Sequence, residues 1–364
     1  MKYVVVLGAA LHLVACGGSV EAPVAEGAPP SIVTPGKEPG GEAAAQAPAP
    51  VAPAAMCNSP ASVTFSANIV DIAVDATHVW ALVAPAADAW RVERAPKCGG
   101  AIELVGGESA TQPNDFSGEA TMPLRLGVSA STAVVLAWSA SQSVVRLTRS
   151  AGGVTNNLMT TLYGPSHQPA FAPHGSGAMW VLNQDLHDTG LGLGDDRIVA
   201  RQIATDQPKL DPHVDDLSVD GAFAFGTGAG RVFRVDVATQ KVTRSSVLLM
   251  AEGKRLVRAL AGAVFVIGAD VARLSADLSQ VQAFPLSEHG DPFDAALHPD
   301  YLFFTKPRSG GHSELYQMRN DGRAVQAVPA VPGEGGELAV DMAAVYVGRG
   351  KSVERIAIQP LPPR

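Results

Sequence analysis

One strand pattern recurs along most of this chain, and its regular spacing limits the possible folds more than any other feature. An apolar residue, any residue and an arginine follow one another at Val92-Glu93-Arg94, Val144-Val145-Arg146, Val199-Ala200-Arg201, Val232-Phe233-Arg234, Val271-Ala272-Arg273 and Val353-Glu354-Arg355. Leu315-Tyr316-Gln317 is a further copy with glutamine in the third place. Arg94 and Arg355 are 261 residues apart, so the seven copies predict a repeat of about 44 residues.

Each repeat also contains two earlier strands that a tight turn connects. The clearest copy has strands at 69–74 and 79–82 on either side of a turn that begins at Asp75, and similar pairs flank Asp220 and Asp341. Alternating apolar residues, β-branched side chains and turns that contain Asp or Gly favour strands. We expect the three aspartates to stabilise their turns by bonding the local backbone.

A repeat of 40 to 45 residues with four short strands is typical of a β-propeller blade. Such a sheet is apolar on both faces and buries them only by stacking against its neighbours around an axis, where Ala73, Gly127 and Ser218 are small enough to fit. The last repeat has only three strands after Glu337, and Val63-Thr64-Phe65 precedes the first full repeat. We therefore predict an all-β fold, a seven-bladed β-propeller of four-stranded antiparallel blades, closed by this N-terminal strand.

The N-terminus carries the features of an export signal. Lys2 precedes an apolar run at 3–13, which is too short to span a bilayer but suits the hydrophobic region of a signal peptide. The run ends in Leu13-Val14-Ala15-Cys16, which resembles the bacterial lipobox, where the cysteine is acylated and becomes the new N-terminus. We predict a signal peptide at 1–15 and a palmitate-type lipid anchor on Cys16.

A tether is predicted at 16–56, between the lipidated cysteine and the propeller domain at 57–364. Of the 40 residues after Cys16, 8 are Pro, 11 are Ala and 6 are Gly, so the segment has too little apolar surface to fold and should be disordered. In lipoproteins of this kind an Asp after the cysteine is a signal for retention at the inner membrane. Gly17 therefore implies delivery to the outer membrane, on either the periplasmic or the cell-surface side.

The other two cysteines, Cys57 and Cys98, suit a disulfide in an oxidising exported compartment. The bridge would close a loop of about 42 residues and stabilise the fold by roughly 4 kcal/mol. The alternative is a pair of buried thiols that do not pair.

Charge and motifs narrow the function. The net charge of −8 argues against nucleic acid as the partner. The sequence has no zinc-protease, thiol-redox, haem-attachment, phosphate-loop or nucleophile-elbow motif. The glycine-rich segment 226–230 lies between two predicted strands, so it is a hairpin turn rather than a dinucleotide loop. The arginines of the recurring pattern are interpreted as structural, with each side chain reaching a carboxylate or a carbonyl of a neighbouring blade.

Loops between second and third strands, and loops between blades, should share one face of the ring. Acidic and histidine residues gather in the loops assigned to that face, and the candidate ligand residues are Asp185, His187, Asp188, Asp195, Asp196, His213, Asp215, Asp216, His289 and Asp291. The first five are assigned to a long second-to-third-strand loop of the third blade. These oxygens could hold Ca²⁺, but none has EF-hand spacing, so we predict no metal or other cofactor.

The body resembles bacterial lipoproteins with degenerate propeller blades of the YWTD/NHL-like or PQQ-like kind. The residues that carry the resemblance are the turn aspartates Asp75, Asp220 and Asp341, the second-strand pairs Val79-Trp80, Met179-Trp180 and Val345-Tyr346, and the Val-x-Arg strands. The lipobox, the tether, the seven repeats and the absence of catalytic motifs together indicate a membrane-anchored, monomeric, non-catalytic module that binds a protein or glycan partner in the cell envelope.

Two alternatives remain open. The chain could be a propeller enzyme of hydrolase or lyase type with its site at the central channel, or an outer-membrane assembly factor. Convergence of His213, Asp215, Asp185 or His289 near the channel, with perturbed pKa values, would favour an enzyme.

Overall fold

A computed structural model describes residues 62–86, 89–109, 122–129, 132–139, 144–161, 169–175, 177–190, 196–205, 213–246, 255–286, 291–307, 313–328 and 336–361. All of them belong to the compact unit Pro53–Arg364. The predicted signal peptide, tether and lipidation site lie outside these ranges. All the regular elements within these ranges are β-strands. The described residues contain no helix that is long and apolar enough to cross a membrane.

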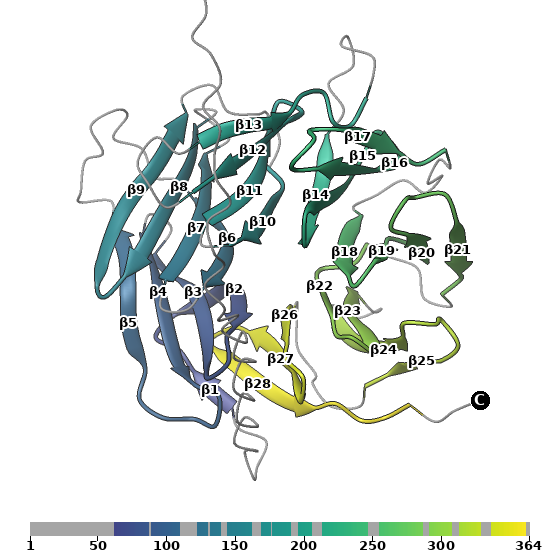
Figure 1. The fold of residues 1–364 in the computed structure, drawn as a ribbon. Helices are drawn as coiled ribbons and strands as arrows, with labels where there is room; N and C mark the ends of the chain where they lie inside the picture. The colour runs from purple at the N-terminus through teal and green to yellow at the C-terminus, as the bar shows by residue number, and fades with distance from the viewer. Residues whose placement is uncertain are drawn as a thin grey trace, which may run out of the picture. The chain divides into compact units, whose positions relative to one another are not determined.

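The strands form seven four-stranded antiparallel sheets, which are arranged around a ring as predicted (Figure 1). Blades one to three contain β2 (Asn68–Val74), β3 (His78–Ala86), β4 (Ala89–Pro96), β5 (Glu103–Ser109), β6 (Met122–Ser129), β7 (Thr132–Ser139), β8 (Val144–Ala151), β9 (Val154–Thr161), β10 (Phe171–His174), β11 (Gly177–Leu182), β12 (Asp185–Thr189) and β13 (Asp196–Ala200). Blades four to six contain β14 (Val214–Asp220), β15 (Phe223–Gly228), β16 (Arg231–Asp236), β17 (Val242–Arg244), β18 (Leu256–Leu260), β19 (Ala263–Ile267), β20 (Val271–Ser275), β21 (Val281–Phe284), β22 (Ala295–Leu297), β23 (Tyr301–Pro307), β24 (Ser313–Arg319) and β25 (Val325–Ala327).

The seventh blade confirms the predicted ring closure. Its strands β26 (Glu337–Val340), β27 (Ala344–Arg349) and β28 (Ser352–Ala357) come from the C-terminal end, and β1 (Ser62–Thr64) adds the outer strand. Val63 pairs with Val353, and the Phe65 amide donates to the Lys351 carbonyl at 2.7 Å. The two ends of the propeller are therefore joined by backbone hydrogen bonds.

The hydrophobic core lies between the blades. The buried apolar residues of the described ranges form seven clusters, one at each junction of neighbouring blades. At the first junction, for example, Trp80 and Leu82 of β3 pack with Leu126 of β6. The inner strands approach so closely that a Cβ added at Gly127 would lie 3.0 Å from the Pro173 side chain. A small residue is therefore needed there, as predicted.

The recurring arginine has the predicted place in most blades, opposite a bulky residue of the second strand. Arg94, Arg234, Arg273 and Arg355 face Trp80, Phe225, Phe265 and Tyr346, and Gln317 faces Phe303. Arg234 donates to the Ala276 carbonyl of the next blade at 3.0 Å, and Gln317 donates to the Gln359 carbonyl at 2.9 Å. In these two blades the position links neighbouring blades, as predicted, whereas Arg94 donates to Glu103 of its own blade.

In the second blade the assignment of this position to Arg146 is wrong. Arg149 faces Val134, the equivalent of Trp80, whereas Arg146 pairs with Ala137. β8 contains two consecutive copies of the pattern, Val144-Val145-Arg146 and Leu147-Thr148-Arg149. Their arginines are three residues apart, and an odd separation along a strand puts two positions on opposite faces. The partner strand, which the pattern does not include, decides between them.

The strand assignment in the third blade is also wrong. β12 is the third strand and begins at Asp185, so Asp188, which faces Met179, takes the arginine position. Arg201 follows the end of β13 instead. The β11–β12 turn is Asn183-Gln184, and both residues have positive φ, 48° and 71°, as tight hairpin turns require. Because this turn lacks the usual glycine, the sequence did not reveal it.

Candidate functional site

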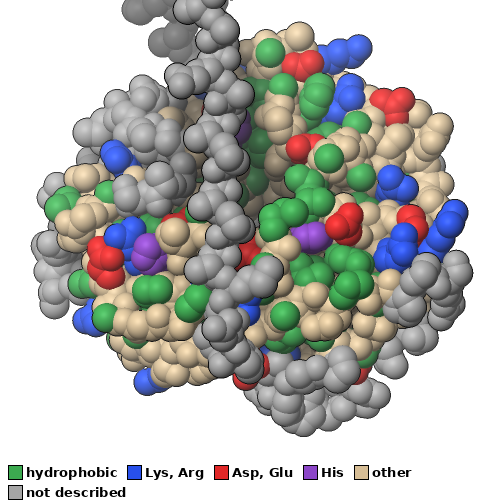
Figure 2. Space-filling model, turned by 60° about the horizontal axis from the view of Figure 1, so that its bottom comes forward, with side chains coloured by type: hydrophobic (Ala, Val, Ile, Leu, Met, Phe, Trp, Pro, Cys, Tyr) green, Lys and Arg blue, Asp and Glu red, His purple; other side chains and the backbone are tan. Residues whose placement is uncertain are grey.

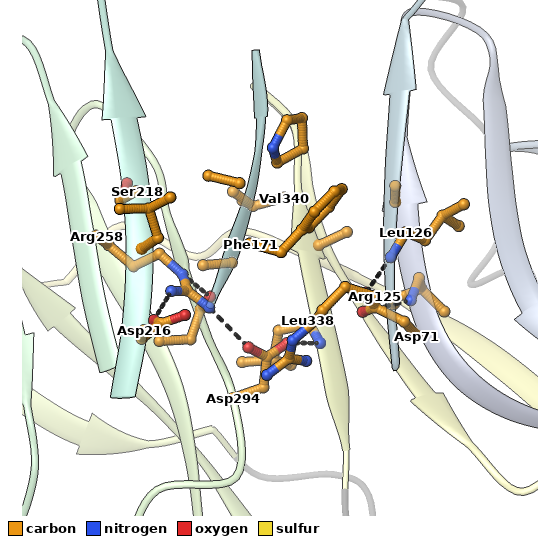
Figure 3. A pocket seen from close by; sticks show the side chains of 18 of the residues that line it. Asp71, Arg125, Leu126, Phe171, Asp216, Ser218, Arg258, Asp294, Leu338 and Val340 are labelled. Atoms are coloured by element: carbon orange, nitrogen blue, oxygen red, sulfur yellow. Dashed lines mark hydrogen bonds and ion pairs between the residues drawn. The ribbon is translucent and has the colours of Figure 1, made fainter. Parts of the chain in front are cut away.

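The inner strands of the seven blades surround a cavity of about 340 Å³ on the ring axis (Figure 3). Its wall comes from β2, β6, β10, β14, β18, β22 and β26, together with Asp294 just before β22. Equivalent positions in the seven repeats meet at the same height on the axis. Residues that are about 44 positions apart in the chain therefore become neighbours there.

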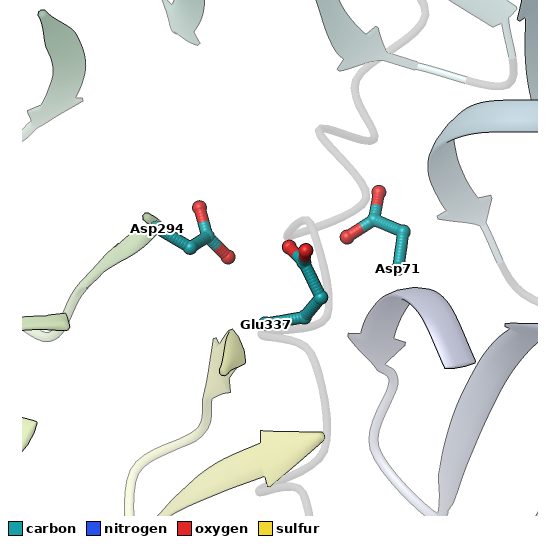
Figure 4. Close-up of side chains that lie close together, drawn as sticks. All are labelled: Asp71, Asp294 and Glu337. Atoms are coloured by element: carbon teal, nitrogen blue, oxygen red, sulfur yellow. The ribbon is translucent and has the colours of Figure 1, made fainter. Parts of the chain in front are cut away.

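Charged side chains gather at one end of this cavity, where the inner strands begin. The axial charge cluster consists of the carboxylates of Asp71, Asp216, Asp294 and Glu337 and the guanidinium groups of Arg125 and Arg258. One oxygen from each of Asp71, Asp294 and Glu337 lies within 4.8 Å of the other two (Figure 4). Buried charges of this density are costly unless they are paired and hydrogen-bonded.

Three of the carboxylates bond the backbone of the next blade. In each pair an amide N–H donates to an aspartate Oδ2: Leu126 to Asp71 at 2.7 Å, Val257 to Asp216 at 2.9 Å, and Leu338 to Asp294 at 2.7 Å. The aspartates thus stabilise the junctions between blades one and two, four and five, and six and seven. Charge-assisted bonds of this kind are stronger than neutral ones.

The two arginines are held differently. Arg258 donates to Asp216, to Asp294 Oδ1 at 2.8 Å and to the Ala295 carbonyl at 2.6 Å. Arg125 lies 3.6 Å from Glu337 Oε2, which is an ion pair without close hydrogen-bond geometry. About a quarter of the Arg125 side chain, 27%, is exposed. Hydrogen bonds to several groups therefore hold the Arg258 side chain in place between blades, whereas Arg125 is held by an ion pair.

The cluster shifts the acidity of its members. Burial raises the pKa of Asp71 to about 6, although the Arg125 guanidinium lowers it and the Asp294 carboxylate raises it. Burial alone would lower the pKa of Arg125, but the carboxylates of Asp71 and Glu337 raise it above its usual value. The Asp71 carboxyl therefore titrates closer to neutral pH than an ordinary aspartate does.

Asp71, Asp294 and Glu337 are also the group with metal-ligand spacing among the residues that the structure describes. Carboxylate oxygens suit hard cations such as Ca²⁺. The blade-three residues predicted as candidates for Ca²⁺ do not form such a group within the described ranges. The guanidinium groups of Arg125 and Arg258 form ion pairs with Glu337 and Asp294 and would compete with a metal ion for these carboxylates. The cluster therefore contains both acidic and basic groups.

The residues predicted for one ligand face do not come together. Of the ten, Asp216 lines the axial cavity. Asp185, His213 and Asp215 lie at the same end of the ring, His187, Asp188 and Asp196 lie toward the opposite end in β12 and β13, and Asp291 precedes β22. Asp195 and His289 lie outside the described residues. The split follows from the third-blade turn, which moves the predicted acidic loop to the connection between third and fourth strands.

The third-blade residues instead pair with one another. His187 Nδ1 lies 2.9 Å from Asp196 Oδ2, and the Thr189 hydroxyl donates to Asp196 Oδ1 at 2.7 Å. Arg197 donates to Asp188 at 2.8 Å, on the same pair of strands. These contacts join β12 to β13, and we interpret them as structural.

Sequence reasoning missed Asp71, Asp294, Glu337 and both axial arginines. A signal was nevertheless present, because an acidic residue stands four positions before each turn aspartate. The segments are Asp71-Ile72-Ala73-Val74-Asp75, Asp216-Leu217-Ser218-Val219-Asp220 and Glu337-Leu338-Ala339-Val340-Asp341. Alternation places the first acid on the face that points to the next blade.

No protein-family model matches the chain, and no curated protein matches it. Solved propeller structures do. A structure titled YCF48 bound to D1 peptide has a TM-score of 0.56 at 10% identity and covers 82% of this chain and 97% of its own. YCF48 from Cyanidioschyzon merolae has a TM-score of 0.59 at 12% identity and covers 82% of this chain and 99% of its own. The Cps50 (Swd1) propeller domain of Myceliophteria thermophila has a TM-score of 0.58 at 13% identity and covers 82% of this chain and 100% of its own. At these identities the likeness shows the fold, a β-propeller.

Proposed function

We propose that this chain is a lipid-anchored propeller of the bacterial cell envelope that binds a protein or glycan partner. The proposed location rests on the lipobox-like segment Leu13-Val14-Ala15-Cys16, which follows a short apolar run and precedes the predicted tether. The propeller supplies a rigid ring with loops on both ends, the usual place for recognition. The tether gives the ring a reach on the order of 35 Å from the lipid.

A protein partner is the better-supported choice. One similar solved propeller is bound to a peptide, and another belongs to a structure titled Mitotic Checkpoint Complex. On the face that Figure 2 shows, acidic and basic side chains are interspersed among hydrophobic ones. A mixed surface of this kind suits a protein better than a polyanion, for which a basic face is expected.

Replacing the cysteine proposed to carry the lipid tests whether the protein is anchored to the membrane. In cells that express the full chain, Cys16→Ser should move the protein from the membrane pellet to the soluble fraction, because no acyl chain then holds it. Ser19→Ala, in the same segment, is the matched control and should stay in the pellet. Membrane attachment of Cys16→Ser equal to that of the control would refute the anchor.

Cross-linking in intact cells tests the binding role. The anchored protein should capture a discrete partner that the displaced Cys16→Ser protein captures less well, since tethering raises the local concentration of the two proteins. Recovery of the same background from both proteins, with no enriched species, would count against a binding module.

The predicted bridge is a separate proposal. Cys98 lies in the turn after β4, and Cys57 lies outside the described residues. Mass mapping of exported, non-reduced protein should recover the two cysteines in one linked peptide pair. Both thiols reacting with an alkylating reagent before reduction would reject the bridge.

An enzyme is the second candidate, and the raised pKa of Asp71 is what favours it. A carboxyl that titrates near neutral pH inside a cavity suits a general acid. Hydrolysis or elimination on a panel of envelope polysaccharides, lost in Asp71→Asn, is the expected result. Turnover that Asp71→Asn leaves unchanged would exclude a catalytic role for this carboxyl.

A further inference from the structure

The axial cavity has two chemically different ends. Carboxylates and guanidinium groups lie at the end where the inner strands begin, and Phe171, Ser218 and Val340 lie further along the axis (Figure 3). Apart from Ser218, the wall beyond the charges is apolar, with Leu217 and Ala339 among its residues. The cavity is therefore complementary to a short amphipathic group with one charged end and one alkyl end.

The charged end has more negative than positive groups. Four carboxylates face two guanidinium groups, and Arg125 and Arg258 are the only lysine or arginine side chains among the described residues that line the cavity. Asp71, Asp216 and Asp294 are only 6%, 5% and 4% exposed. Bulk water therefore screens the excess charge weakly, and a cation on the axis would offset it.

The geometry of three oxygens selects the kind of cation. Asp71, Asp294 and Glu337 each offer one oxygen within 4.8 Å of the other two. A point between three atoms at that spacing lies about 2.8 Å or less from each, which is the length of a charge-assisted N–H···O bond. A primary ammonium has three N–H donors and no acceptor. Each of the three donors could therefore meet one of the three carboxylates.

Asp71 and Asp294 have acceptor capacity left for such donors. Asp71 accepts the amides of Ile72 and Leu126, and Asp294 accepts Arg258 and the Leu338 amide. An ionised carboxylate has about four lone-pair sites, so roughly two remain on each. The existing bonds orient the carboxylates and leave them able to bind a further donor.

We propose that the axial cavity binds an alkylammonium group, with its nitrogen among Asp71, Asp294 and Glu337 and its alkyl chain along the apolar wall. A free small amine and a lysine side chain of a partner share this chemistry. The site is independent of the lipid anchor, so failure of the proposed function would not remove it.

Calorimetric titration of the full-length chain in mild detergent tests the site, with phosphate as buffer because amine buffers would compete. n-Butylamine should bind with a saturable isotherm, at least tenfold more tightly than n-butanol, which has the same length and no charge. Methylamine should bind about tenfold more weakly than n-butylamine, since it lacks the methylenes that contact the apolar wall. Equal binding of n-butylamine and n-butanol, or saturable binding of Ca²⁺ but not of the amine, would overturn the proposal.

Glu337→Gln is the test variant, because this side chain makes the ion pair with Arg125 and is less buried than the aspartates. It should weaken n-butylamine at least tenfold. Glu103→Gln removes the same charge from an exposed pair with Arg94 and should leave binding unchanged. If both variants bind n-butylamine equally weakly, the loss of affinity comes from the change in net charge, and this result would contradict a specific site. Should Glu337→Gln fail to fold, the comparison of amine, alcohol and chain length on the natural chain still decides.

The source of the group is distinguished by competition. If a lysine of the captured partner occupies the cavity, n-butylamine should release that partner from the anchored protein in proportion to its occupancy of the site. Retention of the partner at saturating amine assigns the cavity to a free amine instead. Both results require that n-butylamine binds in the calorimetric test, and in both the cavity binds an alkylammonium group.

Discussion

Asp71 and Asp75 stand four residues apart in and just after the same strand, β2, yet their surroundings are opposite. Asp71 faces the axis, where burial raises its pKa to about 6. Asp75 stabilises the turn beyond the strand: partial burial opposes ionisation, but the amides of Thr77 and His78 and the Trp80 indole N–H lower its pKa below the usual value. Position relative to the ring axis, rather than residue type, therefore decides whether an aspartate stabilises its own turn in the ionised form or bonds the next blade with a raised pKa.

The seventh blade repeats the contrast. Glu337 belongs to the axial charge cluster, and Asp341 accepts the amides of Ala343 and Ala344 as the predicted turn residue should. Asp341 also binds Lys97 Nζ at 2.6 Å, which links the last blade to the first. Turn aspartates thus hold local structure and ring closure, while the axial acids carry the chemistry proposed for the cavity.

The largest effect is expected on the axial side of the comparison. Asp294→Ala removes the acceptor of both Arg258 and the Leu338 amide and leaves a buried guanidinium short of a partner. Breaking such a pair should cost about 3–5 kcal/mol of stability, measured from the denaturant midpoint. Asp300→Ala, on an exposed turn of the same blade, should cost less than about 0.5 kcal/mol. Similar losses in the two variants would show that the axial contacts add little.

A smaller effect is expected on the turn side. Asp75→Ala leaves the Trp80 indole N–H without its acceptor at 2.7 Å, and Trp80 is fully buried. Loss of this bond and of the turn amides should lower stability by about 1–2 kcal/mol. Asp75→Asn keeps an acceptor and should recover about half of the loss. A loss of more than that of Asp294→Ala would reverse the ranking of the two regions.

The smallest effect is a dependence on pH. Because the pKa of Asp71 is raised in the folded state from 3.8 to about 6, its contribution to stability is full below pH 4 and is lost as pH rises through 6. The natural chain should therefore gain about 1 kcal/mol relative to Asp71→Asn between pH 7.5 and pH 5. The two midpoints should be compared at each pH, so that other titrating groups cancel. A difference that stays constant with pH would contradict the shift.

Much of the fold could be predicted from the sequence because the repeat is a local pattern. Seven copies of one strand pattern indicated seven blades, and the surplus strand at 63–65 indicated how the ring closes. Asp75 and Asp341 bond their own turns, as expected. Asp220 is different, since its carboxylate accepts the Gly262 amide of the next blade. A turn residue's partner in another blade depends on how the blades stack, which local sequence does not reveal.

The axial cluster was harder to predict for the same reason. Asp71, Asp294 and Arg125 are far apart in the chain and have no shared motif, and only closure of the ring brings them to one point. Blade three shows a second limit. Asn183-Gln184 forms a left-handed turn without glycine, so the pattern was matched to Arg201 and the acidic residues were assigned to the wrong loop. Patterns that define single strands leave pairing and register to the neighbouring strands.

Titration of the Asp71 carboxyl carbon by ¹³C NMR, assigned by its loss in Asp71→Asn, measures the charged axis most directly. The account predicts a midpoint near pH 6 for Asp71 and a midpoint below the usual value for Asp75 in the same sample. Ordinary or lowered titration of both carboxyls would contradict the buried environment that the account assigns to Asp71 on the axis.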